Sequence, residues 1–371
     1  MDEETSGPHS GPMETFAQAS TSENLRNLVR AEFAPKNTYL NTASNGLLPA
    51  RTVAALHEAA LMRADGRPLD PLYEDVEAAR AAFARLAGVP VGRVAAGSSV
   101  AAHTGLVAAS LPAGVEVLTA EGDFTSVVNP FHARGDLKVR TVPLERLAES
   151  VRPGTALVAV SSAQSADGRI ADLPALREAA REHGARTYVD VSQSAGWLPM
   201  EADAYDHTVT VGYKWLLGPH GVAFLVVPED FGGITPILAG WVAGENPWDS
   251  CYGPLAELAH SARRFDLPPD LAAYAGMRRS LELVEELGVD ALHAHDLALA
   301  DRFRTELAAL GHQPVPAPGS AIVSVPELGH RQPQLSGAGI QTANRAGNLR
   351  ASFHLYNTSD DVDRLLEVLS S

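Results

Sequence analysis

Hydrophobic residues recur along this chain with two alternating periods. Residues 52–64 and 76–89 carry apolar residues at helical spacing, and the second stretch ends near a glycine. Short runs rich in β-branched residues occur at 115–120, 155–160, 186–191, 206–212 and 221–227. Such runs are typical of strands that are buried on both faces. The amphipathic stretch 173–185 separates two of the runs, so the order strand, helix, strand predicts a parallel sheet.

The pattern changes after residue 236. Residues 238–254 are irregular and rich in Gly, Trp and Pro, which predicts a loop. Two long helical patterns, two strand-like stretches and a last helix follow, at 269–288, 289–311, 320–325, 349–357 and 360–369. We therefore predict a large α/β domain at 49–245 and a smaller α+β domain at 246–371. A disordered tail at 1–22 and an N-terminal segment at 23–48 would precede them.

Composition narrows the partners that the chain can have. Its net charge of −16 argues against binding to nucleic acid or to an anionic membrane. A single cysteine, Cys251, excludes an internal disulfide and a cysteine-based zinc cluster, and we expect no metal site. No apolar run approaches the roughly 18 residues of a membrane helix. The acidic N-terminus lacks the apolar core of a signal peptide, so we expect a cytoplasmic protein.

One lysine and one aspartate stand out against their surroundings. Lys214 follows a strand pattern inside the almost uncharged stretch 208–227, and a desolvated lysine can act as a neutral amine that forms a Schiff base. Asp190 lies between two valines at the end of another strand pattern and needs a partner. The protonated pyridine nitrogen of pyridoxal phosphate is one such partner. A surface-loop lysine and a helix-capping aspartate are the simpler interpretations.

Three motifs together carry a family resemblance. They read "DVSQSAG", "YKWLLGPHG" and "LRASFHLYNTSDDVD". Their order along the chain and the spacing between them match those of one known family. The chain from "YLNTASNGLLP" onward resembles the class V branch of fold-type I pyridoxal-phosphate enzymes, which includes cysteine desulfurases, kynureninases and isopenicillin-N-epimerase-like proteins. The resemblance implies an α/β fold-type I transferase fold, a large domain with a mostly parallel sheet, a smaller C-terminal α+β domain, a homodimer and an amino-acid substrate.

The same resemblance assigns residues to the cofactor. Lys214 would be the Schiff-base lysine, Asp190 the partner of the pyridine nitrogen, and Gln193 a contact of the ring hydroxyl. Phe124 falls where the family stacks an aromatic ring or histidine on the pyridine face, although a core phenylalanine is the simpler interpretation. Tyr213 stands where desulfurases commonly carry a histidine, and we place it with the cofactor-binding residues.

Other matching positions concern the phosphate and the substrate. A turn and helix start that would bind the phosphate consist of Ser98, Ser99 and Val100. An ordinary helix N-cap explains the same letters. Arg350 matches the arginine that holds a substrate α-carboxylate with a two-pronged hydrogen bond, a surface ion pair being the alternative. Asn41 and Thr42 lie in the segment that lines the family's substrate mouth.

Departures from the family pattern favour one chemistry. Desulfurases carry a cysteine on a loop before the arginine motif, and here "SGAGIQTANRAGNLR" has none. The stretches "AGENPWDSCYG" and "ARRFDLPPD" are similar to the ergothioneine C–S lyase branch, which cleaves hercynylcysteine sulfoxide. We therefore predict β-elimination from a cysteine S-conjugate or sulfoxide, which yields pyruvate, ammonia and ergothioneine from that substrate, the last at the oxidation level of the sulfenate that leaves. A desulfurase, an aminotransferase or epimerase, and a non-catalytic scaffold are the alternatives, and the leaving group and the role of Cys251 stay open.

Overall fold

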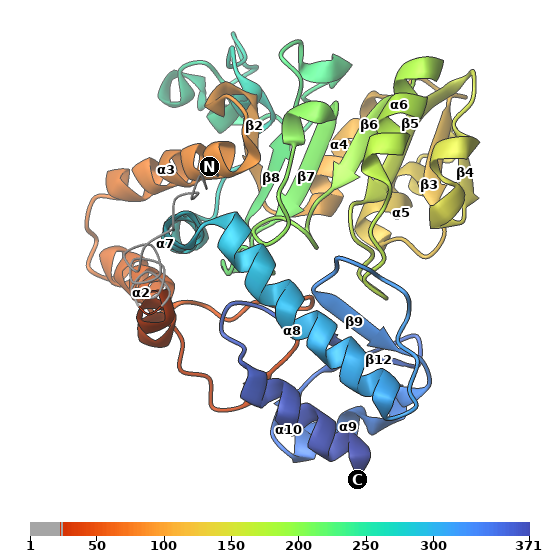
Figure 1. Cartoon of the computed structure of the whole chain (residues 1–371). Coiled ribbons are helices and arrows are strands. Elements are labelled where there is room, and N and C mark those ends of the chain that lie inside the picture. The colour runs from red at the N-terminus through yellow and green to blue at the C-terminus, as the bar shows by residue number, and fades with distance from the viewer. Residues whose placement is uncertain (1–22, 24) are drawn as a thin grey trace, which may run out of the picture.

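A mostly parallel sheet forms the centre of the chain (Figure 1). The computed structural model describes residue 23 and residues 25–371, so the predicted tail at 1–22 lies outside the described part. Within that part the largest sheet has seven strands, in the order β2 (Val94–Gly97), β8 (Ala223–Val226), β7 (His207–Val211), β6 (Arg186–Asp190), β5 (Thr155–Ser161), β3 (Glu116–Ala120) and β4 (Lys138–Val142). β8 runs antiparallel to both of its neighbours, and the other neighbouring pairs are parallel.

Helices cover both faces of this sheet. One face packs against α4 (Val100–Ser110) and α5 (Thr125–Ala133), and the other against α3 (Asp70–Ala87), α6 (Leu173–His183) and α7 (Leu271–Leu287). Successive side chains of β5 alternate accordingly. Leu157 lies in the cluster with α4 and α5, whereas Val158 lies in the cluster with Leu176 of α6. Burial on both faces is the reason why the strand patterns read as continuous apolar runs.

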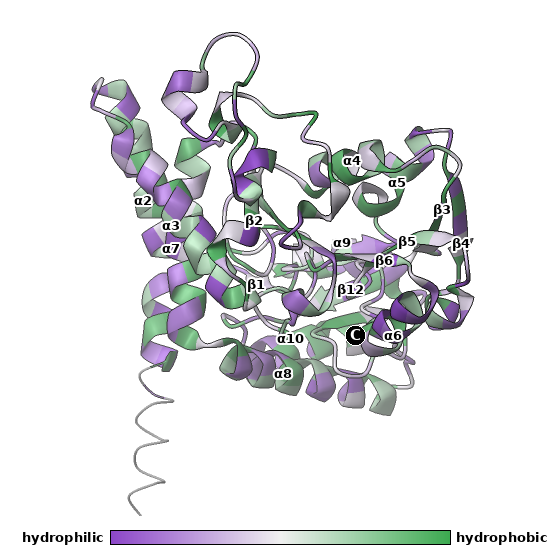
Figure 2. Cartoon of the chain, turned by 90° about the horizontal axis from the view of Figure 1, so that it is seen from above, coloured by the Kyte–Doolittle hydropathy of each residue, from purple (hydrophilic) through white to green (hydrophobic). Residues whose placement is uncertain are grey.

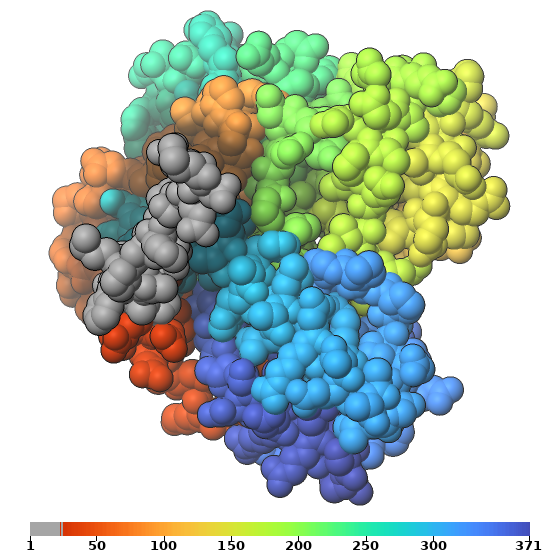
Figure 3. Space-filling view, in the orientation of Figure 1, coloured from red at the N-terminus to blue at the C-terminus, as the bar shows by residue number. Residues whose placement is uncertain are grey.

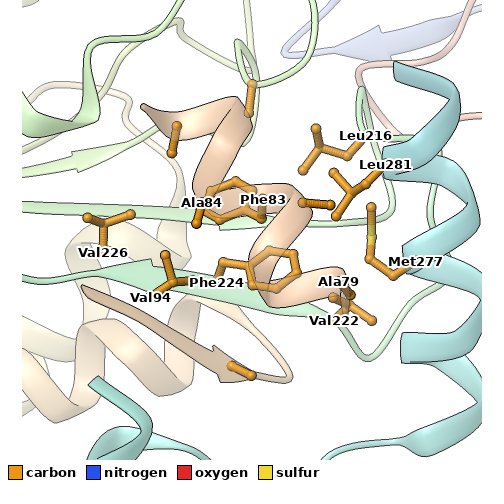
Figure 4. Close-up of a cluster of buried hydrophobic side chains, with 14 of the residues drawn as sticks. Ala79, Phe83, Ala84, Val94, Leu216, Val222, Phe224, Val226, Met277 and Leu281 are labelled. Carbon is orange, nitrogen blue, oxygen red and sulfur yellow. The ribbon is translucent and has the colours of Figure 1, made fainter. Parts of the chain in front are cut away.

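Aromatic stacking ties β8, the strand next to the edge strand β2, to α3. Phe83 of α3 stacks on Phe224 of β8 with ring centroids 4.4 Å apart and planes inclined by 7°, and Met277 of α7 closes the same cluster (Figure 4). α3 ends where the sequence predicted, because Gly88 adopts the left-handed conformation with φ 67°. In Figure 2 the helices α3 and α8 are banded with hydrophilic and hydrophobic residues, as expected of helices with one buried face.

A second hydrophobic core lies below the sheet, in the part coloured blue in Figure 3. The helices and strands of this part are α8 (Val289–Ala309), α9 (Gln332–Gly337), α10 (Ser359–Ser370), β9 (Ile322–Val325), β10 (Ile340–Gln341), β11 (Ala343–Arg345) and β12 (Asn348–Ser352). β12 lies between β11 and β9 and is antiparallel to both. The N-terminal segment joins this part, since β1 (Thr38–Tyr39) pairs with β10.

The helix α7 packs with the large sheet domain, although it follows that domain in the sequence. It lies within the range 246–371 that we predicted for the smaller domain, yet it packs against α3 and against α2 (Ala50–Ala64). The second core begins with α8. The predicted domain limits themselves stay a prediction. Among residues 25–371, no helix combines the length and hydrophobicity needed to cross a bilayer.

Candidate active site

The carboxyl ends of the parallel strands bring the predicted residues together. Asp190 is the last residue of β6, and Lys214 follows β7, the next strand in the sheet. Ser98 follows β2, and Phe124 follows β3. Because β2, β3, β6 and β7 run in the same direction, these residues all lie at the same end of the sheet, beyond the carboxyl ends of its strands. Open α/β sheets bind their ligands at this end.

The turn that carries Lys214 is tight and is held from the N-terminal segment. Leu217 adopts φ 58°, which is uncommon for a residue with a Cβ, and its N–H donates to the Lys214 carbonyl at 3.1 Å. Gly46 donates its N–H to the Tyr213 carbonyl at 2.9 Å. A Cβ on Gly46 would lie 2.1 Å from the Lys214 carbonyl oxygen, so this position requires glycine. Gly46 was not among the predicted site residues, although it forms an Asn-Gly pair with Asn45, which is a visible turn signal.

Lys214 is buried, and its surroundings make the neutral amine more accessible than in an ordinary lysine. Only 5% of the residue is exposed. Desolvation lowers the pKa of Lys214 to about 8, with Asp190 opposing that shift and the guanidinium groups of Arg350 and Arg345 adding to it. A lysine with a pKa near 8 has a neutral fraction at pH 7 that is on the order of a few hundred times larger than that of an ordinary lysine. The amine is therefore prepared to act as a nucleophile or base.

Asp190 is a buried carboxyl group that still needs an opposite charge. It is 3% exposed, and its Oδ1 accepts the N–H of Ser192 at 2.8 Å. Burial raises the pKa of Asp190 to about 6, although the Ser192 hydrogen bonds and the Lys214 charge work against this rise. A cationic ring nitrogen beside Asp190 would restore the charged form.

Two aromatic rings flank the amine. The Lys214 Nζ atom lies 5.0 Å from the ring centroid of Phe124 and 5.9 Å from that of Tyr213. Phe124 is 42% exposed, which speaks against the interpretation as a core residue. Tyr213 stacks on His220, with ring centroids 3.9 Å apart. The structure therefore places a half-open aromatic face beside the lysine, where a flat ring could stack.

In the predicted phosphate turn, one of the two serine hydroxyls already has a hydrogen-bond partner within the protein. Ser99 is the N-cap of α4, and its Oγ accepts the Ala102 N–H at 3.2 Å, whereas Ser98 is exposed and Val100 begins the helix. The simpler N-cap interpretation thus holds for Ser99, and it is compatible with anion binding at the same helix end.

The side-chain amide of Gln193 donates to the Ala43 carbonyl at 3.0 Å and to Ser165 Oγ at 3.0 Å, and its oxygen accepts the Trp215 indole N–H at 2.8 Å. Both amide N–H groups therefore have protein partners. Contact with a ring hydroxyl is left to the Gln193 oxygen, and this role stays a prediction.

Arg350 is a buried cation without an anion. It is 1% exposed, and its guanidinium donates to the carbonyl and hydroxyl of Ser165 and, at 2.7 Å, to Ser44 Oγ. Its Nε has no partner, and it forms no ion pair with any described residue. Burial, helped by the charge of Arg345, lowers the pKa of Arg350 to about 9. This arginine is not the surface ion pair of the simpler interpretation, and a carboxylate is the ligand that it lacks.

The two residues predicted at the substrate mouth have different surroundings. Asn41 reaches the Arg350 cluster, because its Oδ1 accepts a hydrogen bond from Ser44 Oγ at 2.7 Å. Thr42 is fully buried, and its hydroxyl is bonded to that of Tyr356. The structure therefore connects Asn41 with the arginine but gives Thr42 no bond to this cluster.

Two residues outside the predicted site support it from behind. His354 Nδ1 lies 2.8 Å from Asp296 Oδ2, and its Nε2 lies 3.1 Å from the Trp215 carbonyl, next to Lys214. Both side chains of this pair are fully buried. Asp296 comes from α8, so a contact between distant elements holds the lysine turn. No local pattern in the sequence could have paired residues so far apart.

These residues fit pyridoxal phosphate and an amino acid. A buried amine, a buried carboxyl group, an open aromatic face and a helix N-terminus all lie at the carboxyl ends of the parallel strands, and the charge of an unpaired guanidinium acts on the amine. The model of the family named aminotransferase class-V matches residues 39–326. The chain belongs to this family. As the resemblance implied, it is a pyridoxal-phosphate-dependent enzyme.

Individual relatives agree with this assignment. Isopenicillin N epimerase of Streptomyces clavuligerus is 28% identical over 388 residues, which cover 91% of this chain and 95% of the relative. An uncharacterized aminotransferase of Bacillus subtilis is 27% identical over 317 residues, covering 80% and 84%. Among solved structures, the cystine C–S lyase C-DES in complex with cysteine persulfide is 23% identical, has a TM-score of 0.82 and covers 91% of this chain and 98% of its own. The predicted α/β fold is thereby confirmed.

Proposed function

We propose that this enzyme is a carbon–sulfur lyase that performs β-elimination on a cysteine S-conjugate or sulfoxide. Hercynylcysteine sulfoxide is the substrate that the sequence resemblance suggests. The main support is the combination of a buried, easily neutralised Lys214 with an unpaired Arg350, in a cluster that contains no thiol. The similarity to a protein described as a cystine C–S lyase is consistent with this chemistry.

Arg350 holds the substrate in this proposal. Its guanidinium presents a planar pair of donors that matches a carboxylate, and Ser44 and Ser165 fix its orientation. The incoming carboxylate supplies the negative charge that the buried guanidinium lacks. Binding by the α-carboxylate thereby places the α-carbon in a defined position relative to the lysine.

Lys214 moves the proton. As a neutral amine it accepts the proton from the α-carbon, and its lowered pKa makes that form available near neutral pH. When bound, pyridoxal phosphate supplies an electron-withdrawing ring that accepts the electron pair of the broken C–H bond. Asp190 provides the negative charge that keeps the ring nitrogen protonated. The sulfur substituent then departs with its electron pair as an anion, and water hydrolyses the remaining three-carbon fragment to pyruvate and ammonia.

The position of the single cysteine favours elimination over persulfide formation. Cys251 is exposed, and its Sγ donates to the Pro247 carbonyl at 3.7 Å. Its loop contains Trp248, which packs edge-on against Tyr73 of α3. No described contact joins Cys251 to the residues around Lys214. A sulfenate leaves readily as an anion, so elimination needs no protein thiol. A homodimer belongs to the same proposal as an implication of the family resemblance, and a cytoplasmic location stays an expectation from the sequence.

Pyruvate release tests the proposed reaction directly. The holoenzyme is incubated with L-cysteine sulfoxides, including hercynylcysteine sulfoxide, and pyruvate is measured over time. We expect pyruvate without any added amino acceptor, loss of activity in Lys214→Ala, and unchanged activity in Cys251→Ala. Dependence on an amino acceptor would instead indicate an aminotransferase, and inversion at the α-carbon an epimerase. With L-cysteine as the substrate, alanine and released sulfide that depend on Cys251 would indicate a desulfurase, and failure to bind the cofactor would indicate a scaffold.

A further inference from the structure

A second arginine lies beside Arg350 on the same face of the small sheet. In the antiparallel pair of β11 and β12, Ala343 is opposite Arg350, and Arg345 is opposite Asn348. Opposite residues share a face, and so do residues two apart along a strand. Arg345 and Arg350 are therefore diagonal neighbours on one face, with the small side chain of Ala343 on the same face.

One hydroxyl group receives hydrogen bonds from both arginines. Ser44 Oγ accepts from Arg350 Nη2 at 2.7 Å and from Arg345 Nη2 at 3.0 Å. The charge of Arg345 is close enough to lower the pKa values of Arg350 and Lys214. Arg350 is buried whereas Arg345 is exposed, so the pair extends from the inner end of the site toward solvent.

The hairpin holds Arg345 in place by a strained turn. Ala346 and Gly347 form the turn with φ 50° and φ 85°, the left-handed values that a two-residue hairpin of this kind requires. Alanine pays roughly 1–2 kcal/mol for this conformation. The turn is tied down because Asn344 Oδ1 accepts the Gly347 N–H at 3.1 Å and Asn344 Nδ2 donates to the Gly329 carbonyl at 3.0 Å.

Arg345 has no acidic partner among the described residues, although acids are abundant. The chain has 45 acidic and 29 basic side chains, and other arginines commonly pair with them, as Arg302 does with Glu306 and Asp363. The described partners of Arg345 are neutral oxygens, the Asn344 carbonyl and Ser44 Oγ. Two adjacent guanidinium groups without a carboxylate make the local electrostatic potential positive in an otherwise acidic protein. A positive potential favours a ligand with more than one negative charge.

We propose that Arg345 is a specificity residue that binds a second carboxylate, carried on the sulfur substituent of the substrate. This proposal rests on the proposed function and deepens it. Arg350 takes the α-carboxylate at the buried end, and Arg345 takes the distal carboxylate at the exposed end. The substrate class is thereby a cysteine conjugate whose leaving group is itself anionic. Neutral S-alkyl conjugates lack one of the two contacts.

Equilibrium binding of matched thioethers tests the second contact. Dissociation constants of the holoenzyme are measured by titration calorimetry for S-(2-carboxyethyl)-L-cysteine and for its amide, S-(2-carbamoylethyl)-L-cysteine, which has the same shape without the charge. We expect the carboxylate to bind at least tenfold more tightly at low salt, with the ratio falling as ionic strength rises. Arg345→Gln should bring the ratio close to one, and Arg345→Lys should retain part of it.

Arg364 on α10 offers a matched control. It likewise donates to a neutral oxygen, the Ala338 carbonyl, and forms no ion pair with a described residue, but it has no contact with Ser44. Arg364→Gln should keep the wild-type ratio. Equal affinity of the two ligands in the wild type, a preference that survives in Arg345→Gln, or no binding of either ligand would each overturn the proposal.

A separate readout distinguishes this proposal from the lyase proposal. Pyruvate release is measured from the sulfoxides of the same two conjugates. Pyruvate from both sulfoxides at equal efficiency, with equal affinities, would contradict the role of Arg345 and leave the lyase intact. A clear preference for the charged ligand without any pyruvate would support the role of Arg345 and contradict the lyase.

Discussion

Arg80 and Arg350 are both buried, yet their surroundings are opposite. Arg80 is 3% exposed and Arg350 is 1% exposed. Arg80 donates to both carboxylate oxygens of Asp266, at 3.0 and 2.6 Å, and also to Glu77 and the Val94 carbonyl. Despite burial, these carboxylates raise the pKa of Arg80, whereas burial lowers that of Arg350 to about 9.

The difference shows how one residue type serves stability in one place and binding in another. The charge of Arg80 is compensated inside the protein, where Asp266 also accepts the Ala96 N–H at 2.8 Å and so ties α3 to the edge strand β2. The charge of Arg350 meets only neutral oxygens, so the cost of its burial is relieved when an anion arrives. An unpaired buried arginine is thus a sign of a ligand, and a paired one is a sign of architecture.

Removing Arg80 should produce the largest effect, and it should be on stability. In Arg80→Met the Asp266 carboxyl group stays buried without its cation, which should lower the free energy of unfolding by about 3–5 kcal/mol. Urea unfolding measures this loss. The double variant Arg80→Met with Asp266→Leu removes both charges and should regain most of the stability. A loss below about 1 kcal/mol in the single variant would contradict the assigned role.

Removing Arg350 should instead affect activity. Arg350→Gln loses the charged contact with the α-carboxylate, and we expect kcat/KM to fall about 100-fold, or about 2.7 kcal/mol. The free energy of unfolding should change by less than about 1 kcal/mol, because no buried acid is left unpaired. Arg350→Lys keeps a charge without the planar fork and should give an intermediate activity. A large loss of stability with unchanged kcat/KM would show that the two arginines do not differ in the stated way.

Much of this comparison could not be predicted from sequence, because the partners come from distant segments. The motif around Arg350 indicated a carboxylate ligand, but its neutral neighbours Ser44 and Ser165 lie in other loops. Arg80 resembles any arginine on an amphipathic helix, and its partner Asp266 follows much later in the chain. Lys214 was easier, because a lone charge after an apolar strand pattern is visible locally.

The fold shows the same division between local and distant information. The five strand patterns agree with β3, β5, β6, β7 and β8 to within a few residues. The edge strands β4 and β2 were not predicted. β4 is only half-buried and carries polar residues, and β2 is short and rich in alanine and glycine, so neither shows an apolar run.

Ligand binding should stabilise the two arginine variants unequally. A simple α-amino acid such as glycine, present at about ten times its dissociation constant, should stabilise the wild-type holoenzyme by about 1.4 kcal/mol. Arg80→Met should show the same increment on its lower baseline, because its ligand site is intact. Arg350→Gln should show almost none at the same concentration. The shift of the unfolding midpoint with ligand measures the increment, and an equal shift in all three proteins would mean that Arg350 does not bind the carboxylate.

The smallest expected effect is on the pKa of Lys214. A nearby cation disfavours the protonated amine, and Arg350 contributes to the lowering of the Lys214 pKa to about 8. Arg350→Gln removes that cation while Asp190 still favours protonation, so the pKa should rise toward its ordinary value.

Cofactor capture reports this change without turnover. The rate at which the cofactor-free chain takes up pyridoxal phosphate should increase with pH through the pKa of Lys214, because only the neutral amine reacts. In Arg350→Gln the midpoint should move to higher pH, and capture at pH 7 should slow. Arg80→Met should keep the wild-type midpoint, measured at a temperature where it remains folded, because its compensated charge lies with α3 and β2. An unchanged midpoint in Arg350→Gln would mean that the unpaired charge does not act on the amine, and only its direct contact with substrate would remain.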